Sequence, residues 1–230
     1  MSGLIEPLST KGVSATEVTV LFQDEALLVV HKPAGLLSVP GRGPDKQDCL
    51  SARVQREVSD ALIVHRLDMA TSGLMLMARG LVAQRALNHA FEYRQVDKSY
   101  VAVVAGHLAS PVGEWGVIDL PIAVDWPRRP LRIIEPQHGK PSVTRWRVLQ
   151  HLDDPSGHPA TRVELEPVTG RSHQLRVHLQ ALGHPILGDA LYASAALQAQ
   201  APRLLLHASM LRFAHPSTGE RLGFSCPPAF

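Results

Sequence analysis

The chain has 230 residues, of which 45% are hydrophobic and 19% are charged, and its formal net charge at pH 7 is +2. This apolar content is enough for a well-buried core, and Cys49 and Cys226 are too far apart and lack the CxxC spacing of a zinc ribbon or disulfide scaffold. No apolar run approaches the length of a membrane-spanning helix and no signal-peptide pattern opens the sequence, so we expect a cytoplasmic protein.

The expected elements mix strands with helices along the chain. Residues 1–16 lack hydrophobic periodicity and predict a mobile tail. Apolar and β-branched runs predict strands at residues 18–22, 27–31, 61–64, 73–78, 100–105, 161–166, 204–208 and 222–224, with shorter strands between the prolines of 117–150. The first two runs predict a hairpin, which Pro33 ends because proline cannot donate to a strand ladder.

Three stretches carry the periodicity of helices. The fourfold spacing of Leu50, Val54 and Val58 predicts a helix over residues 48–58. A second helix is predicted by one apolar face made of Ala83, Ala86, Leu87, Ala90 and Phe91. For the third, Ser172 is the expected N-cap, Leu175, Leu179 and Leu182 form the buried face, and Gly183 ends the helix. Because no regular βαβ rhythm appears, the fold class is predicted to be α+β.

A charged segment, HRLDMATSG at residues 65–73, separates two apolar runs. It places a guanidinium, Arg66, and a carboxylate, Asp68, at the point where two predicted core strands break. From spacing alone, an ordinary polar loop in which Asp68 or Ser72 caps a turn explains the segment equally well.

Five short elements follow one another in a fixed order. They are KPAGL at 32–36, HRLDMATSG at 65–73, KSY at 98–100, GRSHQLRVHL at 170–179 and HPILGD at 184–189. Together they resemble the RluA family of RNA pseudouridine synthases, although any one of them alone would be weak. The resemblance implies a pseudouridine synthase catalytic fold, with a central mixed, largely antiparallel sheet, flanking helices and an RNA cleft. It also implies a single catalytic domain, here over residues 17–230. Many members of the family carry an N-terminal RNA-binding domain before the KPxG element, but this element begins at Lys32, so we expect no such domain.

The resemblance assigns catalytic roles to three residues. Asp68 would be the nucleophile that attacks the anomeric carbon of a uridine, much as a carboxylate does in retaining glycosidases. Arg176 would be the cation that keeps this carboxylate ionised in a site closed to water, and Tyr100 would stack on the uracil. Without the resemblance, a surface arginine and a packing tyrosine would be the commoner explanations. The chemistry requires no cofactor and no metal.

Several basic residues are candidates for RNA contacts. Arg66 would fill the gap left when the uridine is flipped out, and His65 and Arg171 lie within two of the motifs. The segment from residue 126 to residue 147 contains six basic residues and one acidic residue. Arg128, Arg129 and Arg132 are therefore predicted to form a basic patch. A solvated surface, and a genome whose codons favour arginine, remain alternatives.

The resemblance implies that the partner is RNA, in the form of stem-loops of 23S rRNA, tRNA or both. Within such an RNA a loop uridine is favoured, because it costs least to flip. We expect the protein to act as a monomer. The histidines show no HExxH pattern, so no metal site is predicted, and the KPxG context makes Lys32 part of a loop rather than a Schiff-base lysine. Two other functional classes stay open: a non-catalytic RNA-binding or RNA-chaperone module on the same scaffold, and a carbohydrate-active hydrolase.

Overall fold

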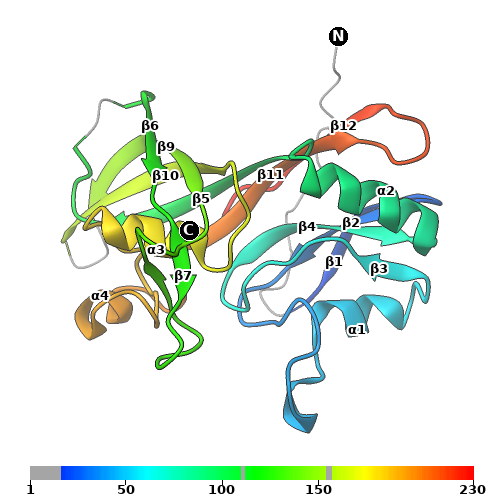
Figure 1. Ribbon diagram of the computed structural model, residues 1–230, viewed down its shortest axis with the longest axis horizontal. Helices are drawn as coiled ribbons and strands as arrows, with labels where there is room; N and C mark the ends of the chain where they lie inside the picture. The colour runs from blue at the N-terminus through cyan, green and yellow to red at the C-terminus, as the bar shows by residue number, and fades with distance from the viewer. Residues whose placement is uncertain (1–16, 110–111, 154–156) are drawn as a thin grey trace. The chain divides into compact units, whose positions relative to one another are not determined.

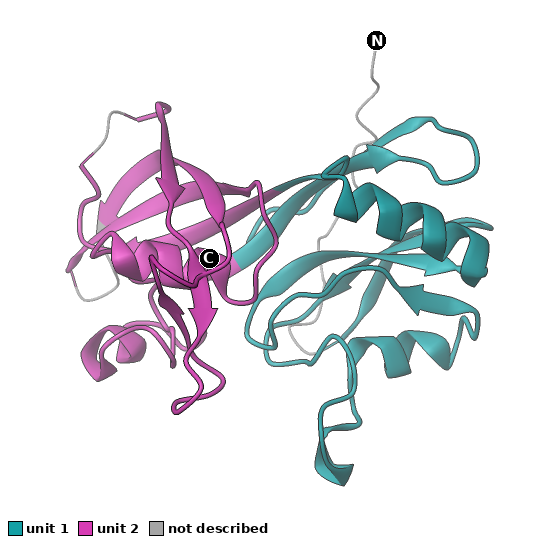
Figure 2. Ribbon diagram, in the orientation of Figure 1, with its two compact units in different colours: residues 1–98, 207–229 teal, residues 99–206, 230 magenta. Residues whose placement is uncertain are grey.

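The computed structural model describes residues 17–109, 112–153 and 157–230, and Figure 1 labels most of its elements. The predicted tail at residues 1–16 lies outside the described residues. The chain divides into two compact units, one of residues 1–98 and 207–229, the other of residues 99–206 and 230 (Figure 2). The single catalytic domain and the RNA cleft expected from the sequence stay predictions.

The first unit is built on a mixed sheet. Its strands are β1 (Thr19–Gln23), β2 (Leu27–Lys32), β3 (Ala61–Ile63), β4 (Ser72–Arg79), β11 (Leu206–Ala214) and β12 (Arg221–Ser225). They are ordered β1-β2-β4-β11, with β3 also paired to β4 and β12 to β11. Strands β4 and β11 are parallel, whereas β1–β2, β2–β4, β3–β4 and β11–β12 are antiparallel. The predicted N-terminal hairpin and the predicted mixed sheet are therefore confirmed.

Strand β4 is buried on both faces, which explains why its sequence is a continuous apolar run. Leu74 and Leu76 belong to one core cluster, together with Leu87 of the following helix. Successive strand residues point to opposite faces, so Met75 and Met77 belong to the other face, and both are 0% exposed. The loop that precedes β4 is thus attached to one of the most deeply buried strands of the unit.

The helices of the first unit follow the predicted stretches with one correction. Helix α1 (Leu50–Gln55) is shorter than the predicted 48–58, and Val58 lies beyond its end; a short 3-10 helix, η1 (Pro44–Lys46), precedes it. Helix α2 (Gly80–Glu92) covers the predicted apolar face, on which Ala83 and Leu87 are buried and Ala86 is exposed. Only a narrow stripe of that face is therefore covered. Within the described residues, no helix combines the length and apolar character needed to cross a membrane.

The second unit contains an antiparallel sheet and a separate hairpin. The sheet, ordered β5-β10-β9-β6, consists of β5 (Asp97–Ala105), β10 (Pro159–Pro167), β9 (Val143–Asp153) and β6 (Trp115–Asp119). The hairpin pairs β7 (Ile122–Val124) with β8 (Arg132–Ile134), and the two helices are α3 (Gln174–Ala181) and α4 (Ala195–Ala199). The series of short strands predicted between prolines is confirmed.

Helix α3 begins later than predicted. Its N-cap is His173, in a left-handed conformation with φ 59°, and not Ser172. Leu182, predicted to lie on the buried face, is 36% exposed because it is the C-cap residue, beyond the last helical turn. Gly183 ends the helix as predicted: its φ is +82°, and its N–H donates to the carbonyl of Gln180 at 2.9 Å.

Candidate active site

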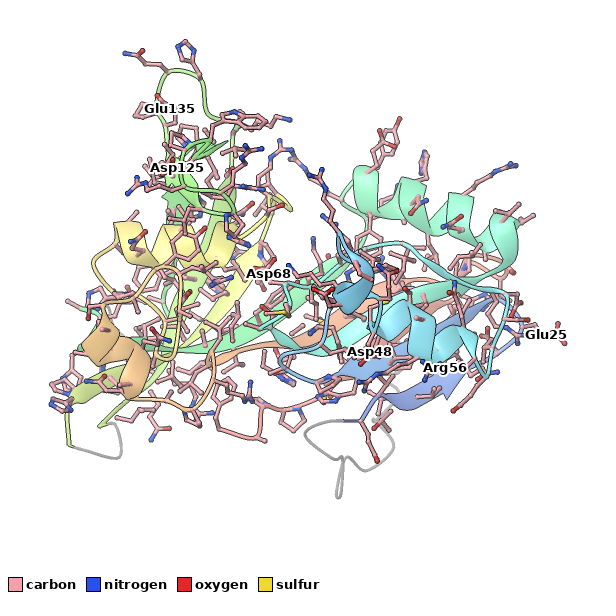
Figure 3. The ribbon with its side chains drawn as sticks, turned by 90° about the horizontal axis from the view of Figure 1, so that it is seen from below. Glu25, Asp48, Arg56, Asp68, Asp125 and Glu135 are labelled. Atoms are coloured by element: carbon pink, nitrogen blue, oxygen red, sulfur yellow. The ribbon has the colours of Figure 1, made fainter. Side chains whose placement is uncertain are left out.

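Asp68, labelled in Figure 3, lies in the loop between β3 and β4, and its two neighbours in sequence are fixed by hydrogen bonds. The hydroxyl of Ser38 accepts the N–H of Leu67 at 3.1 Å and donates to the carbonyl of Leu67 at 2.7 Å. On the other side, the carbonyl of Met69 accepts the N–H of Gly35 at 2.8 Å. The half-buried Asp68 carboxylate is therefore carried by a backbone with little freedom to move.

Lys32 connects the KPAG loop to the loop of Asp68. Its side chain is 0% exposed, and its Nζ donates to the carbonyls of Pro33 and Leu36 at 2.8 Å and of Met69 at 3.1 Å. Burial lowers the pKa of Lys32 to about 7, against the opposing effect of the nearby Asp68 charge. Three carbonyl acceptors match the three N–H bonds of an ammonium. Lys32 thus joins two of the sequence motifs through main-chain carbonyls, a contact that we did not predict.

The exit from the Asp68 loop is fixed where β4 meets β11. Ser72 pairs with His207 and Gly73 with Ala208 across this parallel pair. Gly73 has φ +117°, and a Cβ at this position would lie 2.3 Å from the carbonyl oxygen of Ala208, so only glycine fits. The Ser72 hydroxyl also hydrogen-bonds with Nδ1 of His207 at 2.9 Å.

The described residues include one set that we tested as a metal site. The potential ligand atoms of His31, His207 and Cys226 lie within 4.8 Å of one another. His207, however, uses Nε2 for the carbonyl of Cys226 at 3.0 Å and Nδ1 for Ser72. Burial raises the pKa of the Cys226 thiol, which disfavours the thiolate that a metal requires. These residues fit a packing role better than a metal site, and the expected absence of a metal stays a prediction.

His65 and Arg66 have different surroundings. Nε2 of His65 accepts the N–H of Leu76 at 2.8 Å, and the ring stacks on Phe91 with 4.6 Å between centroids. Burial, together with the positive charge of Lys98, lowers the pKa of His65 to about 3, so the ring is neutral at pH 7. Arg66 is exposed. RNA contacts by either residue stay predictions, but His65 already has a clear role in the fold.

Tyr100 and Arg176 belong to the second unit. Tyr100 is half-buried on β5, opposite Leu165 of β10. Arg176 lies on α3 and is only 4% exposed, and its Nε and Nη2 donate to the two carboxylate oxygens of Asp189 at 2.7 and 2.6 Å. The expected pairing of Arg176 with Asp68 stays a prediction.

Asp189 and Tyr192 form a cradle for Arg176 that we did not predict. Asp189 is 1% exposed and also accepts the N–H of Tyr192 at 3.1 Å. The Arg176 guanidinium lies 5.0 Å from the centre of the Tyr192 ring, within the range of a cation–π contact. The Tyr192 hydroxyl accepts the N–H of Arg132 at 2.9 Å and shares a hydrogen bond of 2.7 Å with Nδ1 of His173. The HPILGD element contained the signal, since a buried arginine requires a carboxylate partner.

A polar network fixes the start of α3. Oε1 of Gln174 accepts the Thr169 hydroxyl at 2.7 Å and the N–H of Arg171 at 3.0 Å, and Nε2 donates to the Thr144 hydroxyl at 3.0 Å. Nδ1 of His178 shares a hydrogen bond of 2.9 Å with the same hydroxyl. The GRSHQLRVH motif therefore has a structural role beyond Arg176. Arg171 is exposed, and its contact with RNA stays a prediction.

The basic segment at residues 126–147 is less basic in three dimensions than along the sequence. Three of its cations are paired with carboxylates: Arg128 with Asp125, Arg145 with Glu166 and Arg147 with Glu164. Two of these acids come from β10 and the third immediately precedes the segment, so a count along the sequence missed them. Arg129 and Arg132, around the loop that joins β7 to β8, are the stronger candidates for phosphate contacts.

The sequence model of the family described as RNA pseudouridylate synthase matches residues 26–181, a stretch that contains Lys32, Asp68, Tyr100 and Arg176. The chain therefore belongs to the RNA pseudouridylate synthase family. It is an RNA pseudouridine synthase, an isomerase that converts uridine in RNA to pseudouridine.

Named relatives and solved structures agree with this family. The chain is 48% identical over 213 residues to the dual-specificity RNA pseudouridine synthase RluA of Escherichia coli (strain K12), covering 93% of this chain and 94% of that protein. The protein of the same name from Yersinia pestis is 48% identical over 211 residues, with coverages of 92% and 99%. Both confirm the predicted RluA family.

Among solved structures, human RNA Pseudouridylate Synthase Domain Containing 1 superposes with a TM-score of 0.78 at 30% identity, covering 96% of this chain and 87% of that one. Human RNA Pseudouridylate Synthase Domain Containing 4 gives a TM-score of 0.72 at 27% identity, with coverages of 92% and 89%. The predicted α+β pseudouridine synthase fold is confirmed.

Proposed function

We propose that Asp68 is the nucleophile of this pseudouridine synthase. The observation that carries the proposal is the double clamp on its loop, where Ser38 holds Leu67, and Gly35 and Lys32 hold Met69. A nucleophile works best when it is held in place before the substrate arrives.

In the proposed reaction, an Asp68 carboxylate oxygen attacks C1′ of the target uridine. The C1′–N1 bond breaks, and its electron pair leaves with the uracil. The base then rotates, and C5 forms a new bond to C1′ as the carboxylate departs. C5 loses its proton and N1 gains one, so the product is an isomer of the substrate and neither an oxidant nor an activated phosphate is consumed.

Tyr100 and Arg176 complete the proposed chemistry, with Tyr100 stacked on the uracil and Arg176 as the cation opposite Asp68. The bidentate pair with Asp189 fixes the orientation of the Arg176 guanidinium before any RNA binds. Arg66 takes the place of the flipped-out uridine, since a planar guanidinium can replace part of the lost stacking. Arg171, Arg129 and Arg132 contact the RNA backbone, and Arg128 and His65 act mainly through the protein scaffold.

We also propose that the substrates are loop uridines in stem-loops of 23S rRNA, tRNA or both. Relatives named dual-specificity RNA pseudouridine synthases support more than one RNA substrate. An unpaired loop base costs less to extrude than a paired one, which favours hairpin loops. The enzyme is proposed to act in the cytoplasm as a monomer, without a metal or cofactor. The relatives are named as RNA pseudouridine synthases, which favours an enzyme over a non-catalytic RNA chaperone.

Asp68→Asn tests the nucleophile, because it keeps the shape of the side chain and removes its charge. We expect turnover to fall by at least about 10³-fold, while RNA affinity and the free energy of unfolding stay close to those of the wild type. The assay is release of tritium from RNA labelled at C5 of uridine, the atom that loses its proton. Asp60→Asn, at an exposed carboxylate of the same unit, is the matched control. Undiminished turnover in Asp68→Asn would show that Asp68 is not the nucleophile.

Arg66→Ala separates base flipping from chemistry. Its loss should remove about 1–3 kcal/mol of interactions that offset extrusion of the uridine. Tritium release should therefore fall steeply on a structured stem-loop and less on a short unstructured strand, whose uridine is already unstacked. Arg56→Ala, at another exposed arginine of the first unit, controls for the lost charge. Equal losses on both RNAs would mean that Arg66 acts on the reaction or on the orientation of Asp68.

A further inference from the structure

The loop that joins β7 to β8 exposes a large aromatic side chain. Trp126 is 66% exposed, although tryptophan usually buries most of its surface. The exposure is unusual for this protein, because Trp115 and Trp146, the other two tryptophans, are only partly exposed on β6 and β9. A planar ligand that covers the Trp126 indole would stack on it, an interaction that water cannot make.

The loop is held in shape by its own hydrogen bonds. Asp125, labelled in Figure 3 and 5% exposed, donates its N–H to the carbonyl of Leu131 at 3.1 Å. Its carboxylate accepts the N–H and Nε of Arg128 at 3.2 and 2.7 Å. At the far end, the N–H of Arg132 donates to the hydroxyl of the buried Tyr192 at 2.9 Å. Trp126 is therefore presented by an ordered loop, and little conformational entropy is lost when a ligand binds there.

Two arginine side chains lie in the same loop region as the Trp126 indole. The Arg129 guanidinium lies 4.8 Å from the Trp126 ring, and its Nε donates to the Trp126 carbonyl at 3.1 Å. Arg132 is held over the same loop by donating to the carbonyls of Pro130 and Leu131 at 3.1 and 3.2 Å. Arg128, in contrast, is neutralised by Asp125. The loop thus offers one aromatic face next to two guanidinium groups.

Trp115 shows what a purely structural arrangement looks like in the same unit. Arg145 and Arg147 lie 4.5 and 4.7 Å from its ring, and each of these arginines also pairs with a glutamate of β10. Its aromatic surface and the neighbouring charges are already used within the protein. For Arg129, the structure describes no carboxylate partner.

We propose that Trp126 and Arg129 form a stacking platform for an unpaired nucleotide of the substrate RNA. A nucleotide offers the two properties that the loop complements, a π face for the indole and a phosphate for the guanidinium groups. The only carboxylate in the loop, Asp125, is buried and already binds Arg128, so the platform binds RNA and does not react with it. The nucleotide is therefore distinct from the uridine that is isomerised. This inference rests on RNA as the substrate and not on the assignment of Asp68.

The test measures affinity for an RNA hairpin and for a fully paired duplex of equal length, by fluorescence anisotropy at several salt concentrations. Trp126→Ala should weaken hairpin binding by roughly 5- to 150-fold, the range for loss of one stacked base, and leave duplex binding unchanged. Because stacking releases no counterions, the salt dependence should stay the same. Trp126→Phe should retain most of the affinity. Tyr93→Ala, which removes an aromatic side chain that is 61% exposed in the other unit, should change neither affinity.

A second readout locates the nucleotide. Hairpins carrying 2-aminopurine at single loop positions should show quenched fluorescence at one position with the wild type, and recovery of that signal with Trp126→Ala. Unchanged hairpin affinity in Trp126→Ala, or an equal loss on hairpin and duplex, would overturn the proposal. Urea unfolding confirms that the variants stay folded. Because every arm measures binding, the result stands even if Asp68→Asn retains turnover.

Discussion

His65 and Lys32 illustrate how single residues of a functional motif can serve the scaffold. Both belong to motifs that resemble those of the family, and each is occupied by hydrogen bonds to the main chain. His65 uses its ring to satisfy the N–H of Leu76, and Lys32 satisfies three carbonyls. A buried main-chain group without a partner is costly, so these side chains are needed for folding before they can affect catalysis.

The low pKa of His65 predicts acid lability. In the unfolded chain His65 gains a proton as the pH falls through about 6.5, whereas the folded ring resists protonation until about pH 3. Its contribution to the free energy of unfolding is therefore fully present above pH 6.5 and is lost between pH 6.5 and 3. His65→Gln keeps an acceptor for Leu76 but cannot titrate, so its stability should fall less steeply over this range.

Urea unfolding at intervals between pH 7.5 and 4.5 measures this slope. His178, whose pKa is also lowered by burial, acts in the same direction, so the slope should decrease in His65→Gln without vanishing. His138→Gln, at an exposed histidine, is the control. Identical slopes for the wild type and His65→Gln would contradict the prediction.

At the level of elements, the strands and helices carry each candidate residue at a place where the backbone is independently fixed. The parallel β4–β11 pair requires Gly73 at the exit of the Asp68 loop. Helix α3 is anchored in its first turn, by the Gln174 network and by the pair of Arg176 with Asp189. Each motif therefore combines a candidate functional side chain with the contacts that orient it.

Asp189→Asn tests the cradle of Arg176. Removing one partner of a buried ion pair costs about 3–5 kcal/mol, so the free energy of unfolding should fall by that amount and turnover should fall as well. Replacing both partners, Arg176→Met with Asp189→Leu, should restore much of the stability but none of the activity. Recovery of activity in this double variant would show that Arg176 is structural only.

The surface offers a matched control for this experiment. Arg53 donates to both carboxylate oxygens of Asp48 at 2.8 and 2.6 Å, the same bidentate geometry, but the Asp48 side chain is 58% exposed. Asp48→Asn should cost far less stability than Asp189→Asn, because an exposed pair gains little over hydration. The comparison isolates burial as the cause, with urea unfolding at pH 7 as the measurement.

For the whole molecule, a net charge of +2 means that RNA affinity depends on where the cations lie. Each phosphate contact releases counterions and adds about 0.7–0.9 to the slope of log affinity against log salt. Since Arg128 is neutralised by Asp125, replacing Arg128, Arg129 and Arg132 together by Gln should reduce the slope by about two contacts rather than three. Arg145 and Arg147 are paired with glutamates, so their double replacement should leave the slope unchanged. An unchanged slope in the triple variant would mean that the loop makes no contact with RNA phosphates.

The fold class, the family and most of the strands could be predicted from the amino-acid sequence. Alternation and apolar runs depend on which residues avoid water, and this preference is local enough to be read without a structure. Helix ends were less predictable. The start of α3 at Gln174 depends on hydrogen bonds with Thr169, 5 residues earlier in the chain, and with Thr144, 30 residues earlier. The exposed Ala86 reflects how narrowly α2 packs on the sheet.

The pairing of charged side chains, in contrast, could be seen only in the three-dimensional fold. Lys32 reaches the Asp68 loop, Asp189 holds Arg176, and the glutamates of β10 neutralise Arg145 and Arg147. These partners are separated by 13 or more residues, and electrostatic energy depends on distance in space and on burial, neither of which sequence spacing contains. The sequence therefore identified the candidate catalytic residues, whereas the structure identified the residues that hold them.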